Sequence, residues 1–194
     1  MMASDHRVHN TTLVRWIVCA IIYLGFALRI VVAAYSSFDA MGPALRGDLL
    51  HHHAAHNIAL GHGFVLDIGE PYSFNPPGYA LFLACSYLLF GEHWFAVAFS
   101  QACISMLSIA LIYIAATKMF NRESGMFAAV FASLYPYTVY HSSRVMDTTL
   151  FTFVMIAVFC FCLHVWQNGH WKKWILLGIL LGLGCLVRTT MLAV

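Results

Sequence analysis

The sequence predicts an all-α polytopic membrane protein, and composition is the first reason. Of its 194 residues, 61% are hydrophobic and 9% are charged, and the mean hydropathy is +0.78. Soluble domains carry about 45–50% apolar and roughly 25% charged residues. The second reason is that the apolar residues fall into long runs, because a spanning helix needs about 20 of them. The net charge of +2 is small and no basic run occurs, so we expect no nucleic-acid partner.

Five apolar runs are predicted to cross the bilayer. The first follows Arg7 and Arg15 and is too long for the core of a signal peptide, so we expect a retained anchor. Tryptophans lie at the ends of the runs, where an indole ring can be buried while its N–H is hydrated. The last run reaches the end of the chain, and we therefore expect a C-terminal truncation of this single transmembrane domain. The predicted spans are 16–35, 94–117, 125–140, 150–166 and 174–194.

A sixth apolar run, 78–90, is too short to cross. Its 13 residues make a helix of about 20 Å, against roughly 30 Å of hydrocarbon. If this run is only half inserted, most of the basic residues outside the spans gather on one side, as the positive-inside bias favours, and Arg46 and Arg144 lie on the other. We therefore expect a cytoplasmic N-terminus, with loops 38–92 and 141–149 on the outer face. The basic residues that gather on the inner side are Arg7, Arg15, Lys118, Arg122, Lys172 and Lys173.

The outer loop 38–92 contains a polar, histidine-rich passage, for which we predict a juxtamembrane helix over 48–60. Asp48 begins this helix, and Gly61 and Gly63 end it. One interpretation is an interfacial helix that Asp48 caps. The other gives Asp48 a chemical role as a general base or a metal-facing carboxylate, and the two are compatible.

Histidines follow Asp48 on the same predicted helix. His52 and His56 are four residues apart, and Asp48 precedes His52 by four, so the three share a face. This spacing suits zinc, although the pattern supplies no assured further ligand. We expect His51 and His53 to point elsewhere and to be solvated.

The second outer loop carries a further carboxylate, Asp147, just before a long apolar run. It is either a helix N-terminal acid stabilised by the macrodipole or a second acid of a site, paired with Arg144. Ionisable residues at membrane depth are functional candidates, so we favour the site. Arg188, near the outer end of the last run, either snorkels or binds phosphate; for Arg29 we expect snorkelling.

The remaining features of the sequence are a proline-containing segment, a set of spaced glycines and six cysteines. The segment from Asn75 to Tyr79 reads Asn-Pro-Pro-Gly-Tyr. Its prolines favour extended backbone just before the short apolar run. It is either a plain turn or the wall of a groove for a lipid or sugar. Gly178, Gly182 and Gly184 have the spacing of close helix packing. The six cysteines lie in apolar stretches and are interpreted as small hydrophobes.

Taken in order, these segments resemble the lipid-phosphate-sugar-dependent glycosyltransferases of the GT-C fold, above all glycosyltransferase family 39. That family includes the protein O-mannosyltransferases and aminoarabinose transferases. The resemblance runs from about residue 20 to the end of the chain. Where many members have a Glu after the first acid and a Tyr shortly after, this chain has Leu49 and His51 or His52. The matching positions are Asp48, Ala55, Asn57, Ile58, Gly61, Gly63, Phe64, Pro76 to Tyr79, Leu89 to Gly91, Ser143 to Asp147, and Cys185 to Thr190.

The resemblance implies inverting transfer of a sugar from an isoprenoid phosphate to an acceptor, at the outer face of a bacterial inner membrane. Asp48 would deprotonate the acceptor hydroxyl, and Asp147 would orient the acceptor or hold a divalent metal. Arg144 or Arg188 would neutralise the leaving phosphate. The further substrate-binding candidates are Asn75, Tyr79 and His52, and the metal-ligand candidates are Asp48, His52, His56 and Asp147.

Two other functions fit parts of the pattern. A small ion or solute transporter would use the histidines and carboxylates as a path, but they concentrate in the outer loops, outside the spans. A non-catalytic fragment, completed by a missing C-terminal part, would fit the short length, because the family is usually far longer.

Overall fold

The structure is a computed structural model that describes residues 2–35, 46–66, 72, 75–167 and 170–193, with backbone alone for 2–15, 46–48 and 193. Its elements are all helices, and the long ones are apolar enough to cross a membrane. The prediction of an all-α membrane protein is therefore confirmed. The helices are α1 (Met2–Tyr35), α2 (Arg46–Ala59), α3 (Pro77–Phe90), α4 (Trp94–Met119), α5 (Arg122–Leu134), α6 (Pro136–Ser142), α7 (Thr148–Gln167), α8 (Trp171–Val187) and the short 3₁₀ helix η3 (Thr189–Ala193).

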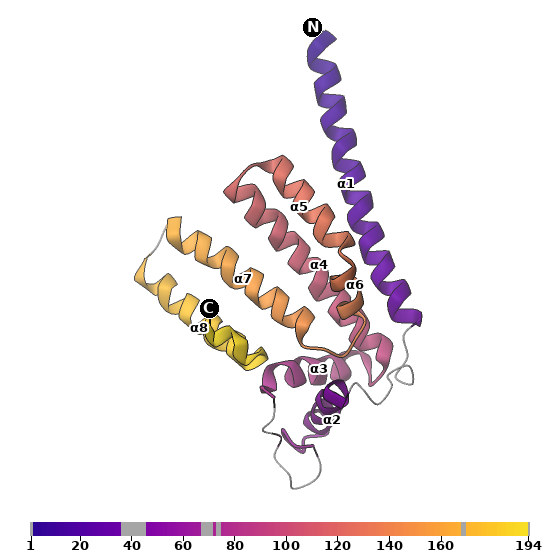
Figure 1. The fold of residues 1–194 in the computed structure, drawn as a ribbon, viewed down its shortest axis with the longest axis vertical. Helices are drawn as coiled ribbons and strands as arrows, with labels where there is room; N and C mark the ends of the chain where they lie inside the picture. Colours follow the sequence, from indigo (N-terminus) through magenta and orange to yellow (C-terminus); the bar gives the residue numbers. More distant parts are fainter. Residues whose placement is uncertain (1, 36–45, 67–71, 73–74, 168–169, 194) are drawn as a thin grey trace.

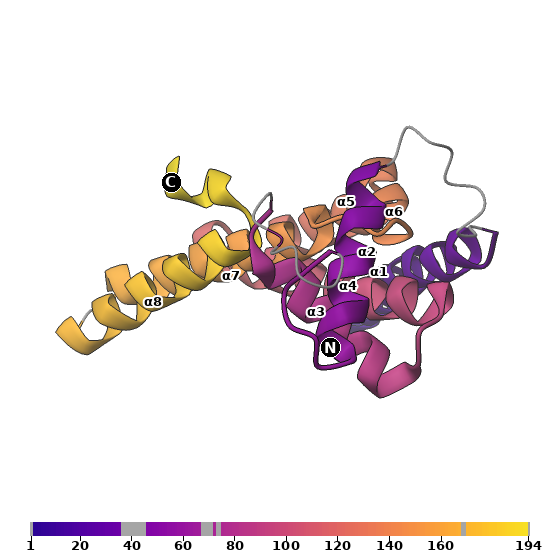
Figure 2. The same ribbon diagram turned by 90° about the horizontal axis from the view of Figure 1, so that it is seen from below.

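The long helices lie side by side, and α4 is the central one. It packs against α1 and α5 on one side and against α7 on the other, and α8 follows next to α7 (Figure 1). Helices α2 and α3 lie at one end of this bundle, where α2 packs on α3 and α3 contacts α4 and α8 (Figure 2). The bundle therefore has one end covered by a separate helical layer.

Within the described part of the chain, three helices are long and apolar enough to span a membrane: Trp16–Tyr35 of α1, then α4 and α7. The run 125–140, expected as one helix, is divided, because α5 ends at Leu134 and α6 begins at Pro136. A proline lacks the N–H that a continuous helix needs and restricts the residue before it. Helix α8 has 17 residues and ends before Arg188, so the last expected span is shorter than predicted.

Helix α3 forms where the short apolar run was predicted. It has Pro77 at its first turn and ends at Gly91, whose φ of 85° lies in the left-handed region. Its 14 residues reach about 21 Å, less than the hydrocarbon thickness. Figure 1 shows α3 lying across the lower ends of the bundle helices rather than alongside them. This placement agrees with an element that does not cross.

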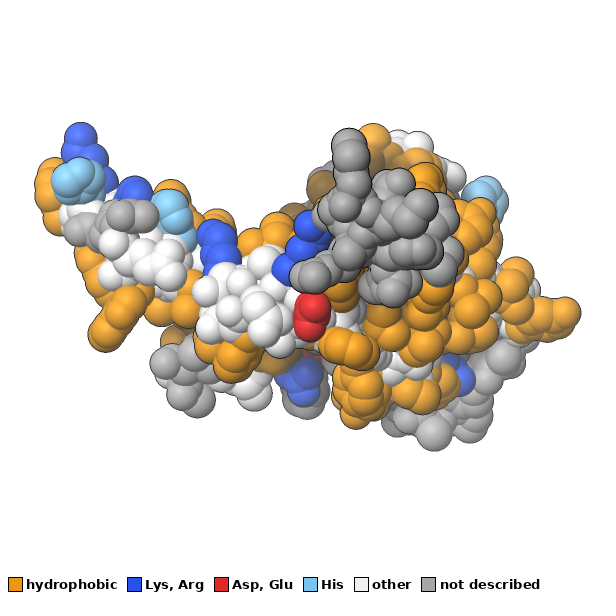
Figure 3. Space-filling view, turned by 90° about the horizontal axis from the view of Figure 1, so that it is seen from above, with side chains coloured by type: hydrophobic (Ala, Val, Ile, Leu, Met, Phe, Trp, Pro, Cys, Tyr) orange, Lys and Arg blue, Asp and Glu red, His pale blue; other side chains and the backbone are white. Residues whose placement is uncertain are grey.

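The opposite end of the bundle carries the basic side chains. Figure 3 looks onto that end and shows Lys, Arg and His gathered on it. The α4–α5 connection there is fixed by Asn121, whose side chain accepts a hydrogen bond from the backbone N–H of Ser124 at 2.8 Å. The basic residues on this end agree with its predicted place on the inner side of the membrane. Basic residues at the α4–α5 and α7–α8 connections are Lys118, Arg122, Lys172 and Lys173.

Arg29 does not snorkel, and that prediction was wrong. Its side chain is only 1% exposed and is hydrogen-bonded inside the bundle. It donates to the Ser105 hydroxyl (3.0 Å) and to the Ser133 carbonyl (2.7 Å). Further acceptors are the Gly25 carbonyl and the Thr138 hydroxyl. A buried polar group is stable when it is bonded in this way, and Arg29 consequently ties α1 to α4, α5 and α6.

Candidate functional site

The candidate site lies at the end of the bundle covered by α2 and α3. Four segments distant in sequence meet there: α2, the start of α3, the α6–α7 loop and the end of α8 (Figures 1 and 2). Asp147 and Arg188 come from the last two segments and face each other. The two outer loops are thus brought to the same end of the molecule.

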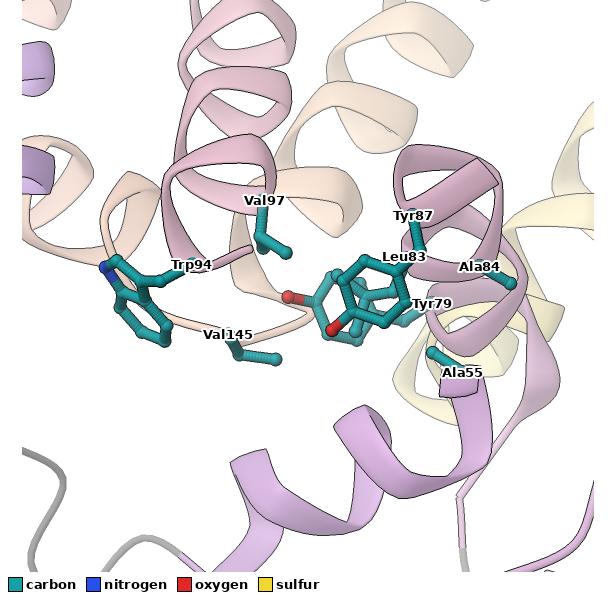
Figure 4. Packing of buried hydrophobic residues seen from close by; sticks show 8 residues of the cluster. All are labelled: Ala55, Tyr79, Leu83, Ala84, Tyr87, Trp94, Val97 and Val145. Atoms are coloured by element: carbon teal, nitrogen blue, oxygen red, sulfur yellow. The ribbon is translucent and has the colours of Figure 1, made fainter. Parts of the chain in front are cut away.

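A buried apolar cluster holds these segments together (Figure 4). Tyr79 and Leu83 of α3 are fully buried, and they pack with Ala55 of α2, Trp94 of α4 and Val145 of the α6–α7 loop. Burying one such side chain contributes about 1.5–3 kcal/mol. Because Val145 is anchored in this cluster, the residues beside it, Arg144 and Asp147, are fixed near α3.

The loop is held on its other side by α4. The Gln101 side chain donates to the Arg144 carbonyl at 2.7 Å, and Gln101 is itself buried. The Arg144 guanidinium lies over the ring of Tyr140, 5.0 Å from its centre. Sequence reasoning paired Arg144 with Asp147, but the structure gives Arg144 this aromatic contact.

The partner of Asp147 is Arg188. Arg188 Nε lies 3.8 Å from Asp147 Oδ2, and the two side chains are 43% and 22% exposed. The guanidinium also covers the ring of Phe151 at 5.5 Å. Since the ion pair is long and half exposed, its contribution to stability is small. Among the residues that the structure describes, Asp147 is the one acidic partner of the Arg188 guanidinium.

Gly78 allows the end of α8 to pack closely against the start of α3. A β-carbon on Gly78 would lie 2.5 Å from the Leu186 carbonyl oxygen and 3.0 Å from the Val187 nitrogen. Only glycine therefore lets the start of α3 approach the end of α8 so closely. The Pro-Pro-Gly-Tyr segment is thus a packing surface that places Arg188, in addition to starting α3.

We expect Gly78→Ala to destabilise the protein by about 1–3 kcal/mol, because overpacking against backbone atoms cannot be relieved by a rotamer change. The measurement is thermal unfolding in detergent micelles. The control is Gly182→Ala, since a β-carbon on Gly182 meets no atom within 4 Å among the described residues. Equal stability of the Gly78 and Gly182 variants would contradict the close approach.

The close packing expected at Gly178 and Gly182 is not found among the described residues, whereas a β-carbon on Gly184 would contact Met191 and Val154.

The two remaining substrate-binding candidates are Asn75, which lies just before α3 and is partly buried, and Tyr79 in the first turn of α3. Asn75 donates a hydrogen bond to the Tyr72 hydroxyl, and Tyr79 is fully buried in the apolar cluster. Burial raises the pKa of Tyr72, and the bond from Asn75 partly opposes this. Tyr79 therefore helps to hold α3 in place, whereas Asn75 is partly exposed.

His52 and His56 form a second polar cluster with Glu92, which follows α3. His52 Nε2 lies 3.6 Å and His56 Nδ1 2.8 Å from the Glu92 carboxylate, and His52 Nδ1 is 2.8 Å from the Tyr87 hydroxyl. The predicted shared face of the two histidines is therefore confirmed. Burial lowers the pKa of His52, and the charge of Glu92 opposes that effect. The sequence analysis missed Glu92, although its place just after the Gly91 turn marks it as an exposed loop acid.

No group of three His, Cys, Asp or Glu side chains suited to a metal is found among the residues that the structure describes. The metal candidates fall into two places, with His52 and His56 at Glu92 and Asp147 at Arg188. Asp48 lies in the first turn of α2, but its side chain is outside the described residues. Its assigned role as a base consequently stays a prediction.

His51 is buried, so the prediction that it is solvated was wrong; His53 is exposed as expected. His51 is 8% exposed and its ring stands edge-on to Tyr79, with centres 5.0 Å apart. Burial lowers the pKa of His51, and the charge of Asp147 acts in the opposite direction. The cause of the error is that α2 docks on α3 through this face of the helix.

An all-helical membrane protein with a polar site at one end of its bundle is the class that the fold defines. Within that class, residues 75–194 match the family model of dolichyl-phosphate-mannose-protein mannosyltransferases. The match covers more than half of the chain, which belongs to this family of membrane glycosyltransferases. It includes α3, the α6–α7 loop and Arg188, and it begins after α2. Searches of curated proteins and of solved structures found no match.

Proposed function

We propose that the protein transfers a sugar from a polyprenyl- or dolichyl-phosphate donor to an acceptor at the outer face of the membrane. The observation that carries this proposal is the meeting of Asp147 with Arg188, beside the start of α3, at one end of a membrane bundle. A donor whose lipid stays in the bilayer presents its phosphate at that depth. Family membership supports the reaction class.

The proposed chemistry is a single displacement at the anomeric carbon. The acceptor hydroxyl oxygen attacks this carbon while its proton passes to the Asp48 carboxylate. The bond from the carbon to the phosphate oxygen breaks, and its electron pair stays on the phosphate. Arg188 stabilises that negative charge through planar N–H donors, and Arg144 of the α6–α7 loop is the alternative donor. Asp147 holds Arg188 in place and orients the acceptor.

The proposed location is a bacterial inner membrane with the N-terminus in the cytoplasm. The basic connections at the far end of the bundle support this orientation, because positive loops remain inside. The site would then face the periplasm. A transporter is not favoured, because the family match is to transferases.

A transfer assay tests the proposal. Membranes containing the protein, with a chain-free control membrane, receive a panel of polyprenyl-phosphate sugars and, separately, the matching nucleotide sugars. We expect product only with a lipid-phosphate donor. Transfer from nucleotide sugars alone would contradict the proposal. Binding of lipid-phosphate donors without transfer would support a fragment that needs a further part of the protein.

A further inference from the structure

Arg29 carries a positive charge inside the bundle that no described acidic side chain neutralises. Its guanidinium donates to two hydroxyl groups and two backbone carbonyls, and all four acceptors are neutral. The acids that form ion pairs among the described residues are Glu92 and Asp147, and neither is paired with Arg29. Neutral acceptors satisfy the N–H groups, whereas a buried charge is usually also paired with an opposite one. An anion placed close to Arg29 would therefore be held by an uncompensated charge.

A cavity of about 60 Å³ adjoins Arg29 and is lined mainly by α4, α6 and α7. Two of its lining residues, Ser105 and Thr138, accept hydrogen bonds from the guanidinium. One layer of side chains therefore separates the cavity from the charge. A water molecule takes up roughly 30 Å³ in the liquid, so the cavity has space for one small ion and is too small for a sugar ring.

The hydroxyl groups on the cavity wall differ in whether their protons have an acceptor. Ser108 and Thr152 donate to carbonyls of their own helices. Ser105 accepts the bond from Arg29, and its own proton has no acceptor among the described residues. Thr149 is only 7% exposed, and its hydroxyl has no hydrogen-bond partner in the described part of the chain. Few buried groups are left in this state, and a bond from a cation makes the Ser105 O–H a stronger donor. Both groups can therefore donate to a ligand in the cavity.

The charges next to the cavity favour an anion over a cation. The acid nearest to the wall in sequence is Asp147, which directly precedes Thr148 and Thr149 at the start of α7. Its carboxylate already has a cationic partner, because Arg188 Nε lies 3.8 Å from Asp147 Oδ2. With Asp147 offset in this way, the charge of Arg29 determines the sign of the ion that the cavity attracts.

We propose that this cavity binds a single chloride ion, to which Ser105 and Thr149 donate their hydroxyl protons and whose charge balances that of Arg29. The proposal concerns the membrane bundle and does not rest on the proposed function. Arg29 belongs to α1, Ser105 to α4 and Thr149 to α7, so the bound ion joins three helices. Because chloride binds this site only in the folded chain, it raises the thermal stability.

Removal of single hydroxyl groups tests the site. Thr149→Val keeps the shape of the side chain and loses the donor, whereas Ser105→Ala also removes an acceptor of Arg29. We expect each change to weaken chloride binding about tenfold or more, as for loss of a hydrogen bond to a charged group. Ser108→Ala is the matched control, because Ser108 lines the same cavity but donates to the Ile104 carbonyl. It should bind chloride as the unsubstituted chain does.

Binding is measured on the purified chain in an uncharged detergent, from the broadening of the chloride NMR signal as the ion exchanges with the protein. Thermal unfolding is recorded in sodium chloride and in sodium gluconate at equal ionic strength. We expect broadening, and a higher unfolding temperature in chloride than in gluconate, whose anion is too large for the cavity. Absence of broadening, equal broadening with Thr149→Val, or equal unfolding temperatures in the two salts would overturn the proposal. Should Ser105→Ala fail to fold, Thr149→Val decides between these outcomes.

Discussion

Asp48→Asn should lower the rate of sugar transfer by about 10²- to 10⁴-fold, the usual contribution of a general base. Asparagine keeps the size of the side chain, and position 48 lies within the first turn of α2, two residues after the helix begins, so the fold should survive. It cannot accept the proton of the attacking hydroxyl. The measurement is turnover with a polyprenyl-phosphate sugar, together with binding of the donor, which we expect to be largely kept.

Glu123→Gln is the control for Asp48→Asn, because Glu123 is an exposed acid in the first turn of α5, at the opposite end of the bundle. It should leave turnover unchanged. An Asp48→Asn protein with undiminished transfer would remove Asp48 from the chemistry. The expected N-cap role would not replace it, because α2 begins at Arg46, two residues before Asp48; stabilisation of the first turn by the helix dipole would then be the better account.

Arg188→Gln should lower turnover by about 10²- to 10³-fold, as expected when one stabilising donor is removed from a developing charge. The loss of stability should be small, because the pair with Asp147 is long and half exposed. Arg188→Lys keeps the charge but loses the planar fork of donors, so an intermediate rate is expected. Turnover and thermal unfolding are measured on the same preparations.

Arg122→Gln is the matched control, since Arg122 begins α5 at the α4–α5 connection, at the end of the bundle away from α2 and α3 (Figure 1). Arg122→Gln should change neither the turnover nor the thermal unfolding temperature. A fall in stability that accounts for the whole loss of turnover in Arg188→Gln would contradict a role in the reaction. In that case the pair with Asp147 would be purely structural.

The sequence was sufficient for the features that depend on local chemistry. The run 78–90 was predicted as a short helix because the proline-rich segment before it breaks the chain and its length is too small to cross. The shared position of the two outer loops followed from counting basic residues on each side. The break between α5 and α6 was also marked, by Pro136, and treating 125–140 as one span overlooked that signal.

The errors concern contacts between segments distant in sequence. Arg29 finds its acceptors on α4, α5 and α6, and no local pattern shows that they surround it. His51 is buried because α2 packs on α3 through the face that carries it. The apolar residues of α2 do not define the buried face of this helix sharply enough to predict that contact. Arg144, a neighbour in sequence, was predicted as the partner of Asp147. The partner in the fold is Arg188, which follows Asp147 by 41 residues.

The central claim is that one outer membrane face holds every residue assigned to the reaction, and site-directed labelling tests it most directly. Single cysteines at His62, Glu123 and His170, all exposed, are placed in a background without the six natural cysteines. An impermeant maleimide added to intact cells should label position 62 alone, and positions 123 and 170 only after the membrane is opened. Labelling of 62 together with 123 or 170 in intact cells would contradict the account.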